Sequence, residues 1–159
     1  MSNLPQLSRK VLREEDLLRE VDALKQLGQR IVFTNGCFDI LHYGHVYLLS
    51  KAADEGEVLI LGLNSDDSVR RLKGASRPIN DQQHRALLLA ALASINYVVI
   101  FNEDTPERII SAIKPDVLVK GGDWKVEEVA GAGFVKADGG RVVIVPYVEG
   151  FSTSGILNR

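Results

Sequence analysis

The sequence predicts an α/β fold, with a doubly wound parallel sheet of five strands and helices on both faces. Short runs rich in Val, Ile and Leu alternate along the chain with segments whose apolar residues recur at helical spacing. The apolar runs are continuous, which indicates strands that are buried on both faces, as in parallel sheets. Right-handed crossovers between such strands make the expected architecture Rossmann-like.

Five short apolar runs predict the strands of this sheet. A helical segment separates each run from the next, so the chain crosses over between parallel neighbours. The predicted strands cover residues 30–34 (RIVFT), 57–63 (EVLILGL), 97–101 (YVVIF), 116–119 (DVLV) and 141–145 (RVVIV).

The helices are predicted from apolar spacing and from residue types that favour helix ends. In the first helix, Leu17, Val21 and Leu24 recur at helical spacing, and Gly28 stands where a C-cap belongs. Ser65 has the residue type and position of an N-cap. The predicted helices cover residues 14–28, 43–54, 65–72, 81–94 (with Asn80 and Gln83 as a capping pair), 105–114, 127–137 and 152 onward, after a loose lead-in of residues 1–12.

The composition is that of one ordinary globular domain. The chain has 159 residues, of which 45% are hydrophobic and 25% charged, and its formal net charge is −2 at pH 7. Nucleic-acid-binding proteins usually have a strong excess of basic residues, so nucleic acid is disfavoured as a partner. The longest apolar run, residues 86–93, is too short to span a bilayer. The length predicts a single domain over residues 1–159. The lone cysteine, Cys37, cannot form a disulfide within the chain, which favours a cytoplasmic protein.

Small and polar residues gather just after the predicted strands. In an open parallel sheet, ligands bind beyond the carboxyl ends of the strands, where the strand order reverses. Glycine and serine there also simply make turns, but turns alone do not explain two histidines, a Lys-Gly-Gly and a Ser-Thr-Ser on one edge. We therefore expect a shared site built from residues 35–45, 64–66, 120–124 and 150–155.

His42 and His45 stand three residues apart at the start of a predicted helix, so they share one face of its first turn. Gly44 leaves room for a ligand at the helix N-terminus, where free N–H groups and the helix dipole favour phosphate. The alternatives are structural histidines, a metal site with Asp39, and a nucleophile pair with Cys37. Phosphate is favoured, because no further cysteine or histidine cluster supports a metal and a lone cysteine is more often a buried filler.

Residues 36–45 (GCFDILHYGH) resemble the G-x-F-D-x-x-H-x-G-H motif of the nucleotidyltransferase superfamily, in which six of ten positions are fixed. The similarity extends over nearly the whole chain and is strongest to the heptose 1-phosphate adenylyltransferase branch. Many relatives carry this domain behind a sugar-kinase domain, and this chain resembles the stand-alone form. The further matching stretches are residues 64–66 (NSD), 71–74 (RLKG), 77–79 (RPI), 119–124 (VKGGDW) and 152–154 (STS).

Two stretches differ from the cytidylyltransferases of the same superfamily. Those carry Arg-Thr-x-Gly-Ile and Arg-Tyr-Val-Asp-Glu, where this chain has residues 148–151 (VEGF) and 95–99 (INYVV). The resemblance therefore implies adenine as the base. The implied reaction transfers AMP from ATP to D-glycero-D-manno-heptose 1-phosphate, which gives ADP-heptose and pyrophosphate for bacterial lipopolysaccharide biosynthesis. Mg²⁺ is expected with ATP, held by phosphates and water rather than by a metal site of the protein.

The resemblance also implies roles for individual residues. His42, His45 and Lys73 would be catalytic and would stabilise charge that develops on the phosphates. For Lys73 and Arg77, the alternative is that both belong to a solvated basic loop and do not touch the substrate. Asp39 is expected to hold its loop rather than to touch substrate. The residues expected to bind the nucleotide are Phe33, Thr34, Asn35, Gly36, Cys37, Phe38, Gly44, Asn64, Gly121, Asp123, Ser152, Thr153 and Ser154, and those expected at the substrate phosphate are Arg77 and Arg85.

Two other functions stay open at this point. One is a cytidylyl- or adenylyltransferase for another acceptor, such as glycerol 3-phosphate or phosphopantetheine, and the other is a nucleotide-binding protein without catalysis. A dehydrogenase and a P-loop ATPase are disfavoured, because neither glycine-rich phosphate motif occurs. The helix over residues 81–94 is apolar almost all round, which predicts burial on two sides and a homo-oligomer contact.

Overall fold

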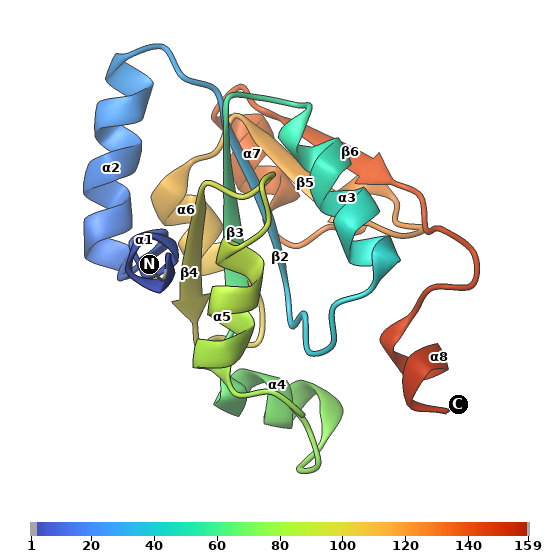
Figure 1. The fold of residues 1–159 in the computed structure, drawn as a ribbon. Coiled ribbons are helices and arrows are strands. Elements are labelled where there is room, and N and C mark those ends of the chain that lie inside the picture. The colour runs from blue at the N-terminus through green and yellow to red at the C-terminus, as the bar shows by residue number, and fades with distance from the viewer. Residues whose placement is uncertain (1–2, 159) are drawn as a thin grey trace.

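The computed structural model describes residues 3–158 and contains a six-stranded, wholly parallel sheet in the order β1-β4-β3-β2-β5-β6 (Figure 1). Five of these strands lie where the apolar runs predict them, so the predicted doubly wound parallel sheet is confirmed. The strands are β1 (Val11–Leu12), β2 (Ile31–Gly36), β3 (Val58–Asn64), β4 (Tyr97–Phe101), β5 (Val117–Gly121) and β6 (Arg141–Val145).

The sixth strand corrects the prediction of five strands and of a loose lead-in. Val11 and Leu12 pair in parallel with Val98 and Val99 of β4, and a short helix over residues 4–8 precedes them. A strand of two residues is too short to show a hydrophobic period, so the sequence pattern does not reveal it. Residues 1–2 of the predicted lead-in lie outside the described residues.

The predicted helices are present, with shifts at their ends. Gly131, with φ of +87°, divides the segment predicted over residues 127–137 into a 3₁₀ turn and a separate helix. Asp81, not Asn80, caps the helix after it, because its carboxylate accepts the amides of Gln83 and His84. The helices of the described residues are α1 (Leu4–Ser8), α2 (Glu14–Gln26), α3 (Tyr43–Ala53), α4 (Asp66–Lys73), α5 (Gln82–Ala90), α6 (Glu107–Ile113), η1 (Val126–Glu128), α7 (Ala132–Ala137) and α8 (Thr153–Leu157).

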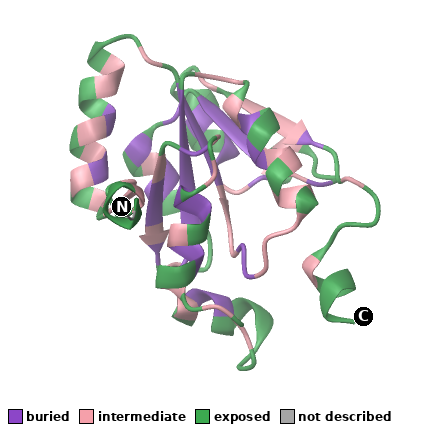
Figure 2. Cartoon of the chain, viewed as in Figure 1, coloured by how far each residue is buried: buried purple, intermediate pink, exposed green. Residues whose placement is uncertain are grey.

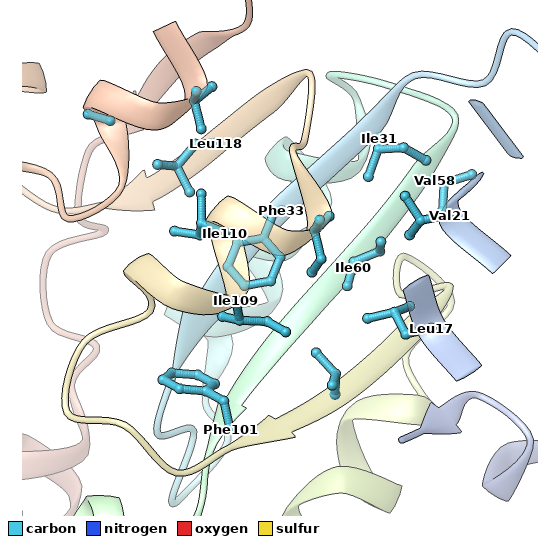
Figure 3. Packing of buried hydrophobic residues seen from close by; sticks show 14 of the residues in the cluster. Leu17, Val21, Ile31, Phe33, Val58, Ile60, Phe101, Ile109, Ile110 and Leu118 are labelled. Carbon is cyan, nitrogen blue, oxygen red and sulfur yellow. The ribbon is translucent and has the colours of Figure 1, made fainter. Parts of the chain in front are cut away.

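Two hydrophobic cores lie on opposite faces of the sheet. Leu17 of α2 and Ile110 of α6 pack with Phe33 and Ile60 on one face, as Figure 3 shows. On the other face, Leu49 of α3 packs with a second set of strand residues and with α5. Every residue of β3 is buried, which explains its continuous apolar run and the purple centre of the sheet in Figure 2.

The strand order places the functional edge of the sheet. From β2 the chain moves outward to β3 and β4, and it then returns to β5 and β6 on the other side of β2. The order therefore reverses between β2 and β5, and the loops that leave these two strands diverge there. Such a switch point at the carboxyl ends of parallel strands is where open α/β sheets bind ligands. Among the described residues, no helix is both long and apolar enough to cross a membrane.

The core at β3 is packed closely enough to require glycine at position 62. A Cβ atom there would lie 2.6 Å from Cζ of Phe33 and 3.3 Å from Cε1 of Phe101, and both rings are buried. We predict that Gly62→Ala lowers the free energy of unfolding by about 1–3 kcal/mol, because the rings must move. The matched control is Gly133→Ala in α7, where no atom lies within 4 Å and alanine favours the helix. Urea unfolding of both variants checks this, and a Gly62→Ala protein as stable as the wild type would contradict it.

Candidate functional site

A cleft lies at the carboxyl edge of the sheet, at the switch point, and consists of two adjoining cavities. The larger, about 600 Å³, lies between the start of α3 and the C-terminal segment, and the smaller, about 170 Å³, lies over the loop that leaves β2. The larger cavity is lined by His42, Gly44, His45, Leu48, Lys73, Gly121 and residues 145–155, and the smaller by residues 35–39 with His45, Leu48, Lys73, Lys120, Gly121, Tyr147 and Thr153.

The two histidines at the start of α3 stack on each other and face the cleft. Their ring centroids lie 3.7 Å apart with 25° between the ring planes, and the Phe38 ring lies 4.9 Å from that of His45. A Cβ on Gly44 would lie 3.0 Å from the His42 ring, so glycine allows this ring to fold back against the helix. Both Nδ1 atoms are buried and have no hydrogen-bond partner among residues 3–158. Because these atoms are inaccessible, a ligand in the cleft would be bound through Nε2 of each ring.

Both imidazoles are neutral at pH 7. Burial lowers the pKa of His45 from 6.5 to about 4, and the nearby His42 and Lys73 contribute to this shift. Burial also lowers the pKa of His42. A neutral imidazole keeps one N–H donor and one acceptor. The pair therefore offers hydrogen-bond donors to an anion, while the positive charge comes from lysines.

The lowered pKa of His45 predicts that acid destabilises the fold. Between about pH 4 and pH 6.5 the unfolded chain binds a proton at His45 and the folded chain does not. The contribution of neutral His45 to the free energy of unfolding is therefore complete above pH 6.5 and is lost as the pH falls toward 4. We expect His45→Asn to lose less stability than the wild type between pH 7 and pH 5 in urea unfolding. Equal losses in the two proteins would contradict the shift.

Asp39 holds the loop that approaches the histidines, as expected. Its buried carboxylate accepts Nε of Arg77 at 2.5 Å and the amide of Ile79 at 2.8 Å. Burial raises the pKa of Asp39, but hydrogen bonds from Arg77, Asn80 and Ile79 outweigh burial and hold the pKa below its usual range. Arg77 thus has a partner within the protein and lines neither cavity. Its contact with a substrate phosphate stays a prediction.

Arg85 lines neither cavity, because its side chain is fully buried, and its expected contact with a substrate phosphate stays a prediction. Its guanidinium donates to the carbonyls of Cys37 at 2.7 Å, Asn64 at 2.9 Å and Asn80 at 2.9 Å. It also donates to Asp66 at 2.8 Å. Arg85 therefore ties the ends of β2 and β3 to the start of α5, a role that the sequence does not reveal since its partners are mostly backbone carbonyls.

Removal of this guanidinium is expected to destabilise the fold. Arg85→Met leaves buried carbonyls and the Asp66 carboxylate without their donors. Breaking a buried ion pair in this way costs about 3–5 kcal/mol of the free energy of unfolding. Urea unfolding measures the loss. A variant with wild-type stability and no activity would instead support a direct contact with substrate.

Other expected side chains lie below or beside the cleft rather than at its wall. β2 continues two residues past its predicted end, so Phe33 and Thr34 are buried within the sheet. Phe33 points into the core on the face opposite α3. Asn64 ends β3 inside the protein and donates to the Ser68 hydroxyl. Asp123 is exposed and lines neither cavity. The nucleotide contacts expected of these four residues, through the backbone for Phe33 and Thr34, stay a prediction.

Most of the expected site residues do meet at the cleft. Ser152 caps α8 by accepting the amide of Gly155, and this holds the C-terminal segment in a turn beside α3. The ring of Phe151 lies 5.2 Å from that of Tyr43 at the mouth of the cleft. The expected residues that line the two cavities are Asn35, Gly36, Cys37, Phe38, His42, Gly44, His45, Lys73, Gly121, Ser152, Thr153 and Ser154.

Two residues at the cleft have no individual role in the sequence-based expectations, although Lys120 belongs to the expected stretch 120–124. Lys120 lines the smaller cavity and has no hydrogen bond or ion pair among residues 3–158, and burial lowers its pKa. Its Nζ lies 5.6 Å from the centre of the Trp124 ring. A lysine at the end of the apolar run DVLV is the signal that could have found it. Tyr147 lines both cavities, and no sequence pattern marks it.

The described residues do not gather a protein metal site. Among residues 3–158, no group of three or more His, Cys, Asp and Glu side chains is placed to hold a metal ion. Asp39 lines the smaller cavity, but its carboxylate already accepts three protein donors.

Comparison with known proteins matches most of this chain to one protein family. The family model described as Cytidylyltransferase-like matches residues 33–144. The bifunctional protein HldE of Geobacter metallireducens is 55% identical over 94% of this chain and 31% of that protein. The protein of the same name from Alkalilimnicola ehrlichii is 53% identical over 97% of this chain and 32% of that protein. The chain therefore spans about a third of the length of these curated relatives.

Solved structures share the fold. The lipopolysaccharide core biosynthesis protein of Thermoplasma volcanium superposes with a TM-score of 0.62 at 29% identity, over 76% of this chain and 98% of that one. The pantoate-beta-alanine ligase of Francisella tularensis superposes with a TM-score of 0.58 over 86% of this chain and 66% of that one. The latter is 16% identical, and this likeness concerns the fold alone.

Proposed function

Since the chain belongs to the cytidylyltransferase-like family, we propose that it transfers AMP from ATP to D-glycero-D-manno-heptose 1-phosphate, which gives ADP-heptose and pyrophosphate. The observation that carries the proposal is the stacked, neutral pair of His42 and His45 facing a cleft with two lysines. The sugar acceptor is supported by the sequence resemblance and by the similarity to a lipopolysaccharide core biosynthesis protein.

The larger cavity suits the nucleotide. It has about 600 Å³, within the range of small-molecule sites, and is bounded by the first turn of α3. Free N–H groups and the positive end of the helix dipole favour a polyphosphate there. His42 and His45 would donate to oxygens of the α- and β-phosphates, and Gly44 lets them approach the helix.

The smaller cavity suits the acceptor phosphate. Lys73 lines both cavities, and Lys120 lines the smaller one without a carboxylate partner among the described residues. Two ammonium groups around a small space attract an anion of high charge. His45 lines both cavities, so a phosphate oxygen held by the lysines would lie beside the α-phosphate of the nucleotide.

The chemistry then needs positioning and charge stabilisation. An oxygen of the acceptor phosphate attacks the α-phosphorus, the bond to the β-phosphate oxygen breaks, and pyrophosphate leaves with its electron pair. The nucleophile is already an anion, so no general base is required. Lysine charge and imidazole donors stabilise the negative charge that moves onto the phosphates. We propose that Mg²⁺ arrives on the ATP phosphates, since its ligands there are phosphate and water oxygens.

We also propose a cytoplasmic enzyme, where ATP is available, and a homo-oligomer. Leu88 on α5 is 49% exposed, while Leu89 beside it is buried in the core, so one large apolar side chain of α5 faces outward beside the polar Gln83 and His84. Sedimentation that gives a monomer mass at micromolar concentration would contradict the oligomer.

Pyrophosphate release tests the reaction directly. Purified protein is assayed with ATP or CTP against heptose 1-phosphate, glycerol 3-phosphate and phosphopantetheine. We expect the highest kcat/KM for ATP with heptose 1-phosphate. A higher value for another pair would make that pair the substrates, and ATP binding without turnover of any acceptor would make the chain a nucleotide sensor.

Substitution of the imidazoles tests the catalytic assignment. His42→Ala and His45→Ala are each expected to lower kcat by about 10²–10³-fold, because each removes one donor to the transition state. The matched control is His84→Ala, since His84 lies on α5 in an exposed pair with Asp81. Circular dichroism confirms that each variant folds. Wild-type turnover by a folded His45→Ala protein would refute the assignment.

A further inference from the structure

Tyr147 occupies the junction between the two cavities of the cleft. It follows β6 in the C-terminal segment and, with His45 and Lys73, is among the residues that line both cavities. The site as described so far gives it no chemical task. Tyr147 lies beside His45 and Lys73, which we propose bind phosphate, so an acceptor bound to them lies next to the tyrosine ring.

The backbone at the end of β5 supports this ring. A Cβ atom on Gly122 would lie 2.8 Å from Cζ and from the hydroxyl oxygen of Tyr147, so only glycine lets the outer end of the ring rest there. Gly122 also has φ of +119°, a conformation that other residues rarely adopt. The Gly122 amide donates to the carbonyl of Val145, which holds the end of β5 against the segment that carries Tyr147.

The rest of the tyrosine is exposed. Its relative exposure is 69%, and its hydroxyl has no hydrogen-bond partner among residues 3–158. A ring that packed for stability would be buried and its hydroxyl paired. A supported ring with a free face and a free hydroxyl is instead a surface on which an uncharged, ring-shaped group can bind.

The size of the smaller cavity indicates which group this is. Its volume, about 170 Å³, is well below the range of about 300–1,000 Å³ typical of ligand sites. A phosphate held by Lys73 and Lys120 therefore fills much of it, and the sugar attached to that phosphate extends to the junction where Tyr147 stands.

We infer that Tyr147 determines acceptor specificity, with its ring face contacting the C–H face of the sugar whose phosphate the two lysines hold. This inference rests on the proposed function, because it takes a sugar phosphate as the acceptor. The contact selects cyclic acceptors over open-chain ones, since a flat ring and a pyranose ring match in shape. It acts on the acceptor and not on the nucleotide.

Steady-state kinetics of Tyr147→Ala, Tyr147→Phe and a control, Phe134→Ala, test the inference. Phe134 is another exposed aromatic residue, 50% exposed, and it lies on α7 outside both cavities. We expect Tyr147→Ala to raise the KM for heptose 1-phosphate about tenfold and to leave the KM for ATP unchanged. Tyr147→Phe keeps the ring and is expected to stay within about twofold of the wild type, as is the control.

Titration calorimetry of heptose 1-phosphate and of glycerol 3-phosphate separates this inference from the proposed function. We expect Tyr147→Ala to weaken binding of the sugar phosphate and to leave binding of glycerol 3-phosphate unchanged. Any of three results would overturn the inference: an unchanged KM for heptose 1-phosphate in Tyr147→Ala, an equal rise in its KM for ATP, or a Tyr147→Phe variant that binds the sugar phosphate as weakly as Tyr147→Ala. In each case, turnover of heptose 1-phosphate by the wild type would still uphold the proposed function. A wild-type protein that neither binds nor adenylates the sugar phosphate overturns both.

Discussion

The hydrogen bonds of the buried Arg85 guanidinium are the interaction on which the shape of the cleft depends. The carbonyls of Cys37 and Asn64 lie at or just beyond the ends of β2 and β3, where the strands diverge toward their loops. Buried carbonyls without partners are costly, and a planar fork of donors satisfies several at once. Asp66 balances the charge of Arg85. Because Arg85 holds the carbonyl of Cys37, the loop that leads into α3 follows one defined path.

The electrostatics of the cleft follow from this fixed loop. Burial keeps the stacked imidazoles neutral, so they add donors without adding charge that would oppose folding. The two lysines supply the charge, and the carboxylate of Asp39 is paired with Arg77 rather than free to repel a phosphate. An anion that enters therefore meets donors and cations already in place, and little of the protein has to reorganise when charge moves between phosphates.

The sequence predicts the parts of this protein that depend on local pattern. The runs of Val, Ile and Leu locate β2 to β6, and the spacing of His42 and His45 predicts a phosphate site at the start of α3. What it does not reveal depends on tertiary contacts. β1 is too short to show a period, Arg85 reads as a cation of the site although it lies beneath it, and Tyr147 gains its position only because Gly122 is folded against it.

All of these features support the proposed arrangement, in which a nucleoside triphosphate would lie against the imidazole end of α3 and an anionic acceptor would lie in the smaller cavity next to it. A crystal structure with a non-hydrolysable ATP analogue tests this most directly. The account predicts phosphate oxygens within hydrogen-bond distance of His42 and His45, in the larger cavity, with the Arg85 hydrogen bonds unchanged. A triphosphate bound anywhere else, such as the amino-terminal edge of the sheet, would contradict it.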